Sequence, residues 1–275
     1  MNILITGASG FLGNSLVEES LRRNHTVTGC GHSEVRIQRS RQKYPQVPFY
    51  SIDMADKKLL ANIVDKHSIE YIIHAAAMKH VGICENNPTK AMTTNVIGSH
   101  NIIEVSKQFN VKNVIAISTD KAINPSCVYG CTKLLMEKMM IEHGYSTLQG
   151  VNFFFSSGSV LDIWDQALRR GEPITINTKD TTRYFTKGIS AAQKILDNLN
   201  SKGTYITLDD CYRVSLHALS TAFCAHHNYH NTADYTAISA EKNEEEVPQN
   251  IEIINTNAAS LQKLLEDHYA ANIYE

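Results

Sequence analysis

The sequence predicts an α/β fold, because short apolar runs that suit buried parallel strands alternate with stretches of helical periodicity along the first half of the chain. A glycine-rich turn follows the first of these runs, and chemically active side chains follow a later one. Open parallel sheets bind their ligands at the carboxyl ends of the strands, where both features would lie. We therefore expect a Rossmann-type, doubly wound parallel sheet at residues 1–150 and a small α/β substrate-binding cap at residues 151–275.

Length and composition narrow the classes of function. The 275 residues suffice for one large domain or two small ones, and the formal net charge of −2 argues against a nucleic-acid partner. No apolar run approaches the roughly 20 residues of a membrane span, and Met1 leads directly into a strand rather than a signal peptide. The cysteines form no Cys-x-x-Cys pair, and the histidines show no metal-ligand spacing. We expect a cytoplasmic protein with free thiols and no metal.

The first strand, at residues 2–5, leads into a glycine-rich turn and a helix at residues 14–23. Such a unit forms a dinucleotide cradle: Gly7 permits the tight turn, Gly10 lets the backbone approach a pyrophosphate, and Gly13 allows close helix packing. The helix N-terminus also faces the negative charge. We expect the turn residues to bind the cofactor: Gly7, Ser9, Gly10, Phe11, Leu12 and Gly13.

The end of the second strand, at residues 25–29, should distinguish NAD from NADP. An enzyme selective for NAD usually places a carboxylate there to bind the ribose hydroxyls. This chain has His32 and Ser33 instead, followed by Arg36, which predicts tolerance of a 2′-phosphate. We therefore expect NADP, with NAD as the alternative if a longer strand brought Glu34 to the ribose.

Two further strands complete the cofactor side. Asp53 ends the strand at residues 49–53, with Met54 beside it, and we expect Asp53 to touch the adenine unless it only caps a helix. The strand at residues 70–77 ends in small residues against which a cofactor would lie flat: Ala75, Ala76 and Ala77.

The loop after this strand holds Lys79 and His80, which could reach substrate phosphate or hydroxyls. The alternative is that both are ordinary exposed cations. Asn95 lies on a helix expected at residues 88–108, and we expect it to brace the backbone near the catalytic strand and to support the cofactor.

The chemically active group follows the strand at residues 113–117. Tyr129 and Lys133 lie four residues apart on a helix expected at residues 128–141, and so share one face. An ammonium beside a phenol should lower the pKa of Tyr129 from about 10 toward neutrality, as a general base requires. We predict an active site made of these two residues and three that follow the strand: Thr119, Asp120, Lys121, Tyr129 and Lys133.

The alternation weakens after a sixth strand, expected at residues 150–155. Further elements are expected in this half: a helix at 160–170, a strand at 173–176, and helices at 190–199, 215–225 and 258–270. The acidic run at residues 241–246 should be solvated. Arg183 is a candidate for a nucleotide phosphate, because a guanidinium can fork to two oxygens, with a surface arginine as the alternative.

Four segments carry a resemblance to a known family: HAAAMKHV at residues 74–81, CENNP at 84–88, TNVIG at 94–98 and STDKAINP at 118–125. With the Gly-x-x-Gly-x-x-Gly turn, they resemble the UDP-N-acetylglucosamine 4,6-dehydratases of polysaccharide and flagellin-sugar biosynthesis, which are extended short-chain dehydrogenases/reductases. The resemblance covers residues 1 to about 140. Epimerases of the same superfamily usually lack an acid and a base directly after the Ser-Thr pair, so the resemblance implies a dehydratase.

In the mechanism that the resemblance implies, Tyr129 takes the C4 hydroxyl proton of a UDP-amino sugar while hydride moves to the nicotinamide. Lys121, as a neutral amine, then removes the C5 proton, and Asp120 protonates the departing C6 hydroxyl before hydride returns to C6. The pKa of Lys121 should therefore lie below its usual value of about 10.4. Tyrosine at position 129 further implies inversion at C5. Relatives pair through the helices that carry Asn95 and Tyr129, so a dimer or larger homo-oligomer is expected.

The resemblance thins beyond residue 140. Relatives carry an Arg-Tyr-Gly-Asn-Val segment where this chain reads VNFFFSS at residues 151–157, so substrate contacts there do not transfer, and Asn152 is kept only as a candidate. A C-terminal Arg-Pro-Gly-Glu-Lys run also lacks a clear counterpart. Two alternatives stay open: a 4-epimerase or 4-keto reductase that uses Thr119, Tyr129 and Lys133, and a catalytically silent fold that binds NADP as a sensor or partner subunit.

Overall fold

The computed structural model describes residues 1–176, 181–229, 234–235 and 252–271, and the chain divides into two compact units. The first unit comprises residues 1–150 and 187–208, and the second comprises residues 151–186 and 209–275. The sequence predicted a single boundary between two domains at residue 150. In the structure, residues 187–208 also belong to the first unit. The acidic run at 241–246 lies outside the described residues.

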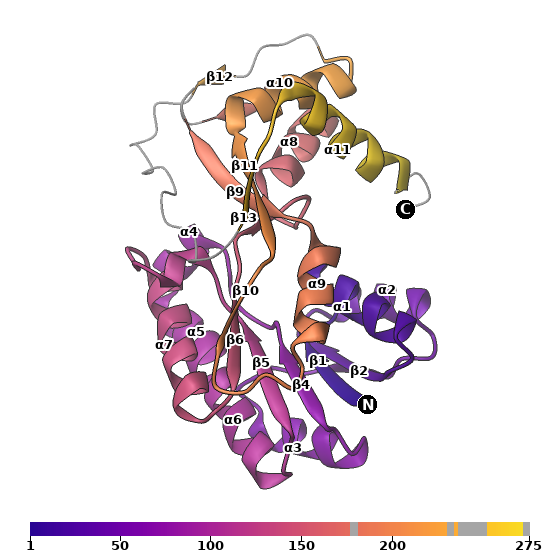
Figure 1. Cartoon of the computed structure of the whole chain (residues 1–275), viewed down its shortest axis with the longest axis vertical. Coiled ribbons are helices and arrows are strands. Elements are labelled where there is room, and N and C mark those ends of the chain that lie inside the picture. Colours follow the sequence, from indigo (N-terminus) through magenta and orange to yellow (C-terminus); the bar gives the residue numbers. More distant parts are fainter. Residues whose placement is uncertain (177–180, 230–233, 236–251, 272–275) are drawn as a thin grey trace. The chain divides into compact units, whose positions relative to one another are not determined.

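The first unit contains a seven-stranded sheet in the order β10-β6-β5-β4-β1-β2-β3, in which every neighbouring pair is parallel (Figure 1). Its strands are β1 (Asn2–Thr6), β2 (Thr26–Gly31), β3 (Phe49–Ser51), β4 (Tyr71–His74), β5 (Asn113–Ile117), β6 (Ser146–Gln149) and β10 (Tyr205–Thr207). The strand order reverses direction between β1 and β4, which is where doubly wound sheets bind their ligands. The predicted fold class is confirmed.

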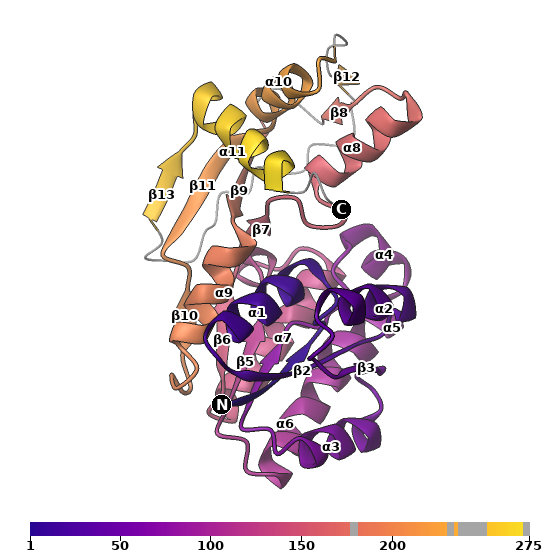
Figure 2. The ribbon, with the colours of Figure 1, turned by 90° about the vertical axis from the view of Figure 1, so that its right-hand side faces the viewer.

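Helices cover both faces of this sheet. They are α1 (Phe11–Arg22), α2 (Glu34–Lys43), α3 (Lys57–Lys66), α4 (Val81–Asn86), α5 (Pro88–Met92), α6 (Gly98–Gln108), α7 (Val128–Glu142) and α9 (Gly188–Asp197). α1 packs against α9, while α3, α6 and α7 pack in a row on the other side (Figures 1 and 2). Fully buried Leu4, Ile72 and Val114 of the sheet meet the apolar faces of that row and form the core.

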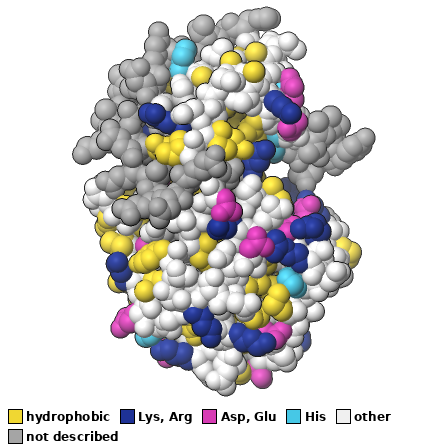
Figure 3. Space-filling model, viewed as in Figure 1, with side chains coloured by type: hydrophobic (Ala, Val, Ile, Leu, Met, Phe, Trp, Pro, Cys, Tyr) yellow, Lys and Arg dark blue, Asp and Glu magenta, His cyan; other side chains and the backbone are white. Residues whose placement is uncertain are grey.

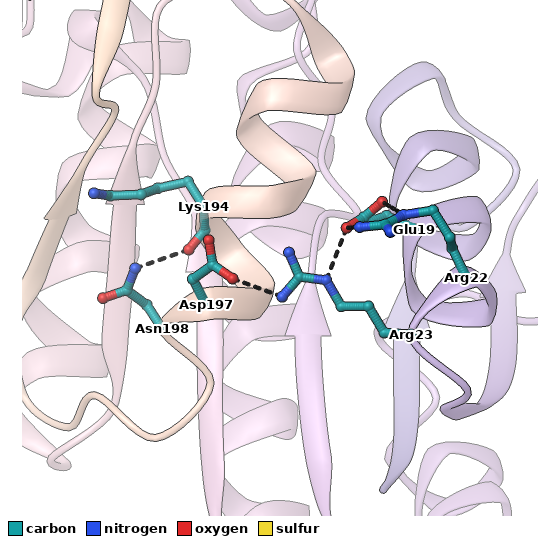
Figure 4. A network of polar contacts seen from close by, with 6 residues as sticks. All are labelled: Glu19, Arg22, Arg23, Lys194, Asp197 and Asn198. Atoms are coloured by element: carbon teal, nitrogen blue, oxygen red, sulfur yellow. Dashed lines mark hydrogen bonds and ion pairs between the residues drawn. The ribbon is translucent and has the colours of Figure 1, made fainter.

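Charged side chains tie α9 to α1, as Figure 4 shows. The Glu19 carboxylate accepts hydrogen bonds from Arg22 at 2.6 and 2.7 Å and from Arg23 at 2.7 Å, and Arg23 also donates to Asp197 of α9 at 2.6 Å. Glu19 is only 1% exposed. The hydrogen bonds from Arg22 are the largest of the influences that hold the pKa of Glu19 down at about 2, against the opposing effect of burial. We call Glu19, Arg22, Arg23 and Asp197 the Glu19 clamp.

The second unit has its own sheet and core. Its four-stranded sheet is mixed, in the order β13-β11-β9-β7. The elements are β7 (Asn152–Phe153), α8 (Val160–Arg170), β9 (Thr182–Thr186), β11 (Asp210–Ser215), α10 (Leu216–His226), β13 (Glu252–Asn255) and α11 (Ala258–Ala271), with a small pair of strands, β8 (Thr175–Ile176) and β12 (Asp234–Tyr235). Fully buried Trp164, Phe223 and Leu265 lie at the centre of the core.

The sixth strand and the helix expected at residues 88–108 differ from the structure. The sixth strand of the first unit is β6, not residues 150–155, because buried Ser146 and Thr147 fit the sheet despite their polarity, and the Ser146 hydroxyl donates to the Ser201 carbonyl at 2.6 Å. The helix expected at residues 88–108 is interrupted by a π-helical segment, η1 (Thr93–Ile97).

Three further features of the described residues bear on function: the surface charge, the length of the helices and the grouping of possible metal ligands. Acidic and basic side chains are interspersed over the face of the first unit drawn in Figure 3. Within the part of the chain that the structure describes, no helix is both long and apolar enough to cross a bilayer. The same part holds no group of three or more His, Cys, Asp and Glu residues arranged for a metal ion.

Candidate active site

The glycine turn packs directly against the end of β4. Gly7 has a φ of +68°, in the left-handed region that favours glycine. A Cβ on Gly7 would lie 2.8 Å from backbone atoms of Ala75 and Ala76, and one on Gly13 would lie 2.1 Å from the Gly7 carbonyl oxygen. Gly10 is the N-cap of α1 and offers no side-chain acceptor to the first N–H groups of that helix, which suits an anion such as a pyrophosphate. These residues fit a dinucleotide.

The remaining turn residues have different surroundings. A Cβ built on Gly31 would lie 3.0 Å from the Ser9 hydroxyl, so Ser9 stands beside the end of β2. The Phe11 ring packs against Gly188 of α9, and Leu12 is buried. Phe11 and Leu12 would therefore meet a cofactor through their main chain more than through their side chains.

The end of β2 carries no carboxylate. The strand ends at Gly31, His32 and Ser33 follow it, and Glu34 already belongs to the first turn of α2. Arg36 is exposed on the same helix. The longer strand that would bring Glu34 to a ribose is therefore not formed.

Asp53 follows β3 and faces two hydrogen-bond donors. It accepts from the Ala55 N–H at 3.0 Å and from the Lys90 ammonium at 2.9 Å. These two bonds, that of Ala55 first, lower the pKa of Asp53. The helix-capping alternative for Asp53 is wrong, because Asp56 caps α3. Met54 beside it is buried.

The three alanines follow β4, which ends at His74 rather than at residue 77. Asn95, in the π-helical segment, holds the chain just beyond them. Its side chain accepts from the Met78 N–H at 2.8 Å and donates to the Met78 carbonyl at 2.9 Å and to the Thr132 hydroxyl of α7 at 3.0 Å. Asn95 thus joins the end of β4 to the helix that carries Tyr129. The π-helical turns of proteins often occur at functional sites.

A compact acid and base pair lies after β5, where the chain forms a single 3-10 turn, Asp120–Ala122. Buried Asp120 accepts hydrogen bonds through one carboxylate oxygen from the Thr119 hydroxyl at 2.7 Å, from the Lys121 N–H at 3.0 Å and from the Lys121 ammonium at 3.3 Å. The Lys121 side chain remains partly exposed, so it faces both the carboxylate and solvent.

The pKa of Tyr129 does not fall toward neutrality. Burial raises it to about 12, against the lowering effects of the Lys121 charge and of a hydrogen bond with Thr119. Lys133 is 2% exposed, and burial lowers its own pKa to about 8. The prediction of a depressed Tyr129 pKa due to Lys133 is therefore wrong: burial outweighs the positive charge, and Lys121 is the lysine whose charge acts on the phenol.

The predicted substrate residues are distributed between the units. Lys79 and His80 are exposed in the loop after β4, where His80 precedes α4. Asn152 and Arg183 belong to the second unit, where Asn152 donates to the Tyr184 carbonyl at 3.0 Å and Arg183 donates to the Thr182 carbonyl at 3.0 Å. The first unit thus brings together Thr119, Asp120, Lys121 and Tyr129.

A family model described as polysaccharide biosynthesis protein matches residues 3–261, nearly the whole chain. The chain belongs to this family. Its members are extended short-chain dehydrogenases/reductases, as the sequence resemblance predicted.

Individual relatives match part of the chain. An uncharacterized membrane protein of Methanocaldococcus jannaschii is 34% identical over 70% of this chain and 61% of its own length. The capsular polysaccharide biosynthesis protein CapD of Staphylococcus aureus is 30% identical over 70% of this chain and 35% of its own. The chain thus spans less than two thirds of either relative.

Solved structures share the fold across both chains. UDP-glucose 4-epimerase of Thermotoga maritima, determined with UDP-glucose, superposes with a TM-score of 0.84 at 19% identity and covers 100% of both chains. dTDP-glucose 4,6-dehydratase of Bacillus anthracis, determined in complex with NAD, gives a TM-score of 0.73 at 14% identity over 97% of this chain and 90% of its own.

Two buried residues of this family member were missed from the sequence. His74 contacts the Thr6 hydroxyl at 2.7 Å and the Ser99 hydroxyl at 3.0 Å, and burial, followed by the Lys133 charge, lowers its pKa to about 3. Glu137 is buried one turn beyond Lys133. Its spacing was the available signal, since residues 129, 133 and 137 continue one row along α7.

Proposed function

We propose that this chain is a nicotinamide-dependent nucleotide-sugar 4,6-dehydratase that acts on UDP-N-acetylglucosamine or a close UDP-amino sugar. The observation that carries the proposal is the 3.3 Å contact between the Asp120 carboxylate and the Lys121 ammonium, in a place where both charges act on Tyr129. An oxidoreductase that only moves a hydride at C4 needs the tyrosine and a nicotinamide, and no further acid or base. Loss of water across C5 and C6 needs an acid and a base as well.

The reaction requires a neutral amine and a carboxylic acid, and the 3.3 Å contact would let the two side chains exchange the proton that produces them. Transfer of one proton from the Lys121 ammonium to the Asp120 carboxylate turns the ion pair into a neutral amine and a carboxylic acid. The amine then takes the C5 proton, and the acid protonates the C6 hydroxyl as it leaves as water. These two steps restore the ammonium and the carboxylate, so the pair is ready for another cycle.

Tyr129 acts at C4 with help from Thr119. The Tyr129 phenolate takes the C4 hydroxyl proton and becomes the phenol, and the Lys121 charge and a hydrogen bond with Thr119 both act to lower the pKa of Tyr129. A nicotinamide dinucleotide held by the glycine turn and Asn95 would supply the redox chemistry, as a reversible hydride acceptor, and its oxidised form would add positive charge near the phenol. Lys133, four residues after Tyr129 on α7, is buried, and we propose that it adds a positive charge beneath the site without acting directly on the phenol.

The dinucleotide would lie on the glycine turn, with Asn95 and the three alanines on its nicotinamide side. His32, Ser33 and Arg36 at the end of β2 favour NADP, because no carboxylate stands there to repel a 2′-phosphate. NAD is the alternative, as the B. anthracis structure was determined with that cofactor. Lys79, His80, Asn152 and Arg183 are proposed substrate contacts.

The test is incubation of the purified protein with UDP-N-acetylglucosamine and either cofactor. We expect mass spectrometry to show loss of one water molecule and NMR to show a 4-keto-6-deoxy sugar with inverted C5. Asp120→Asn and Lys121→Ala should each lower the rate of dehydration by about 10²- to 10⁴-fold. The matched exposed variants Asp65→Asn and Lys58→Ala on α3 should retain it. Wild-type rates in folded Asp120→Asn and Lys121→Ala variants would refute the assignment.

A 4-epimerase is the second candidate, favoured by the shared fold of the T. maritima UDP-glucose 4-epimerase. Thr119, Tyr129 and Lys133 would serve that reaction as well. An epimerase would convert UDP-N-acetylglucosamine into its C4 epimer without change of mass, and its rate would be nearly insensitive to Lys121→Ala. These two results together would favour the epimerase over the dehydratase.

We also propose a homodimer formed through α5, η1 and α7. Each contributes an exposed apolar side chain, Met92, Ile97 and Leu135 respectively, which a second copy of the chain would cover. Light scattering should give the mass of a dimer, and Leu135→Glu should give that of a monomer. A monomeric wild-type protein at micromolar concentration would contradict this proposal.

A further inference from the structure

Glu137 is a buried ionisable residue that the proposed mechanism leaves without a role. It lies on α7 four residues after Lys133, which itself lies four residues after Tyr129, so the three side chains follow one another along the helix. Glu137 is 1% exposed and Lys133 is 2% exposed. A carboxylate and an ammonium buried this deeply are costly unless each compensates the other's charge.

The contacts of Lys133 leave its charge in need of a partner. Its ammonium donates to the Met136 thioether at 3.1 Å, and a thioether is only a weak acceptor. Asp120, the nearest catalytic carboxylate in sequence, is already paired with Lys121 and bonded by Thr119. Glu137 is the carboxylate whose charge acts on Lys133, and it opposes the effect of burial on the lysine.

Polar side chains surround the Glu137 carboxylate, but the hydrogen bonds that it accepts are long. α7 packs against β5 and β6 (Figure 1). The Gln149 amide, just at the end of β6, approaches the two carboxylate oxygens at 3.4 and 3.3 Å, and the Ser118 hydroxyl after β5 also acts on the carboxylate. Burial raises the pKa of Glu137, while Ser118, Gln149, Lys133 and exposed Lys138 oppose that increase.

The third titratable neighbour of Lys133 is His74 at the end of β4, and it is uncharged. The Ser99 hydroxyl donates its proton to the Asn95 carbonyl at 2.6 Å, so it must accept from His74 Nε2. His74 Nδ1 is then unprotonated and accepts from the Thr6 hydroxyl. With a pKa of about 3, His74 is neutral near neutral pH. It therefore adds no second positive charge beside the Lys133 ammonium.

We propose that Glu137 is a positioning residue that supplies the buried counter-charge of Lys133 and thereby keeps this lysine an ammonium beneath the active site. The role of that ammonium in catalysis rests on the proposed function, whereas the charge effect of Glu137 on Lys133 does not. Loss of the carboxylate leaves burial unopposed, so Lys133 gives up its proton at lower pH. The site then loses its buried positive charge within the physiological range.

The experiment is a direct titration of Lys133 by NMR in protein labelled with ¹³C at the lysine ε-carbon, the signal being assigned by its absence in Lys133→Arg. We expect Glu137→Gln to lower the titration midpoint by about 1 pH unit or more. Glu142→Gln removes the same charge from the exposed end of α7 and should leave the midpoint unchanged. An equal midpoint in wild type and Glu137→Gln would overturn the proposal.

Two further measurements separate this proposal from the proposed function. The alkaline limb of the pH dependence of kcat should move down with the NMR midpoint in Glu137→Gln and stay in place in Glu142→Gln. If no dehydration is detected but the midpoint moves, the proposed function fails and the role of Glu137 stands. If Glu137→Gln does not fold, Glu137→Asp keeps the charge one methylene further away and should give a smaller decrease, and no decrease would overturn the proposal.

Discussion

The two most buried glutamates of the first unit, Glu19 and Glu137, have the same exposure of 1% and opposite electrostatic behaviour. In the Glu19 clamp, three short hydrogen bonds from arginines hold the pKa of the carboxyl down at about 2. Around Glu137 the bonds are long, and burial raises the pKa instead.

The opposite pKa shifts suggest different roles for the two buried glutamates: structural for Glu19 and, as we propose, functional for Glu137. Arginines that fork onto a carboxylate satisfy it fully, so Glu19 contributes to stability through geometry. Glu137 has only long hydrogen bonds and lies four residues along α7 from Lys133, whose pKa is itself lowered to about 8. Pairs of titratable groups that are held away from their ordinary pKa values are typical of active sites. Exposure alone would not have distinguished the two residues.

The largest effect should come from removing Lys133 together with the carboxylate of Glu137. Lys133→Met combined with Glu137→Gln replaces two buried charges by neutral groups of similar volume. We expect kcat to fall by about 10²- to 10⁴-fold, because the site loses its ammonium, while the free energy of unfolding stays equal or rises. Steady-state kinetics and urea unfolding measure the two quantities. A clear loss of stability would show that this pair is structural, like the Glu19 clamp.

The second effect concerns the N-terminal end of α1, the helix whose other end carries Glu19. Gly13→Ala places a methyl group 2.1 Å from the Gly7 carbonyl oxygen, so the turn must shift. We expect dinucleotide affinity to fall at least about tenfold and stability to fall by about 1–3 kcal/mol. Calorimetry of cofactor binding tests this. Gly82→Ala on α4, where nothing lies within 4 Å of the new Cβ, is the matched control and should bind as the wild type does.

The smallest effect should come from the clamp. Glu19→Gln should lower the free energy of unfolding by only about 1 kcal/mol at neutral pH, because solvent screens the ion pair with exposed Arg22. It should leave kcat unchanged. A folded-state pKa of about 2, below the ordinary 4.5, means that the stabilisation is present above pH 4.5 and is lost as pH falls toward 2. Urea unfolding across this range should show a steeper loss in wild type than in Glu19→Gln. Parallel curves would contradict the clamp.

Much of the sheet could be predicted from its apolar runs. Val114, Ile115 and Ala116 read as a buried strand and form one, and the glycine spacing identified the cradle at its edge. The sixth strand was misplaced because its residues, Ser146 to Gln149, look polar, whereas the aromatic run that follows looks like a strand and belongs to the second unit. Hydrogen bonds to distant main-chain groups, such as that from Ser146 to Ser201, leave no local pattern.

Sequence spacing grouped the residues of the candidate site better than it predicted their charges. Sequence spacing was enough to group Asp120, Lys121 and Tyr129, since adjacency and helical periodicity are local properties. It could not show that desolvation of the partly buried Tyr129 raises its pKa, or that Lys121 rather than Lys133 is the cation that acts on it. Burial depends on the packing of several elements, which no single segment encodes.

The return of residues 187–208 to the first unit has a consequence for synthesis and for protein engineering. A truncated protein that stops at residue 150 would lack β10 and α9, which leaves β6 as an unpaired edge strand and uncovers α1. On the ribosome, the sheet is incomplete until residue 208 has emerged, after the first strands of the second unit. The shortest stand-alone version of the first unit would therefore have to join residues 187–208 to residue 150.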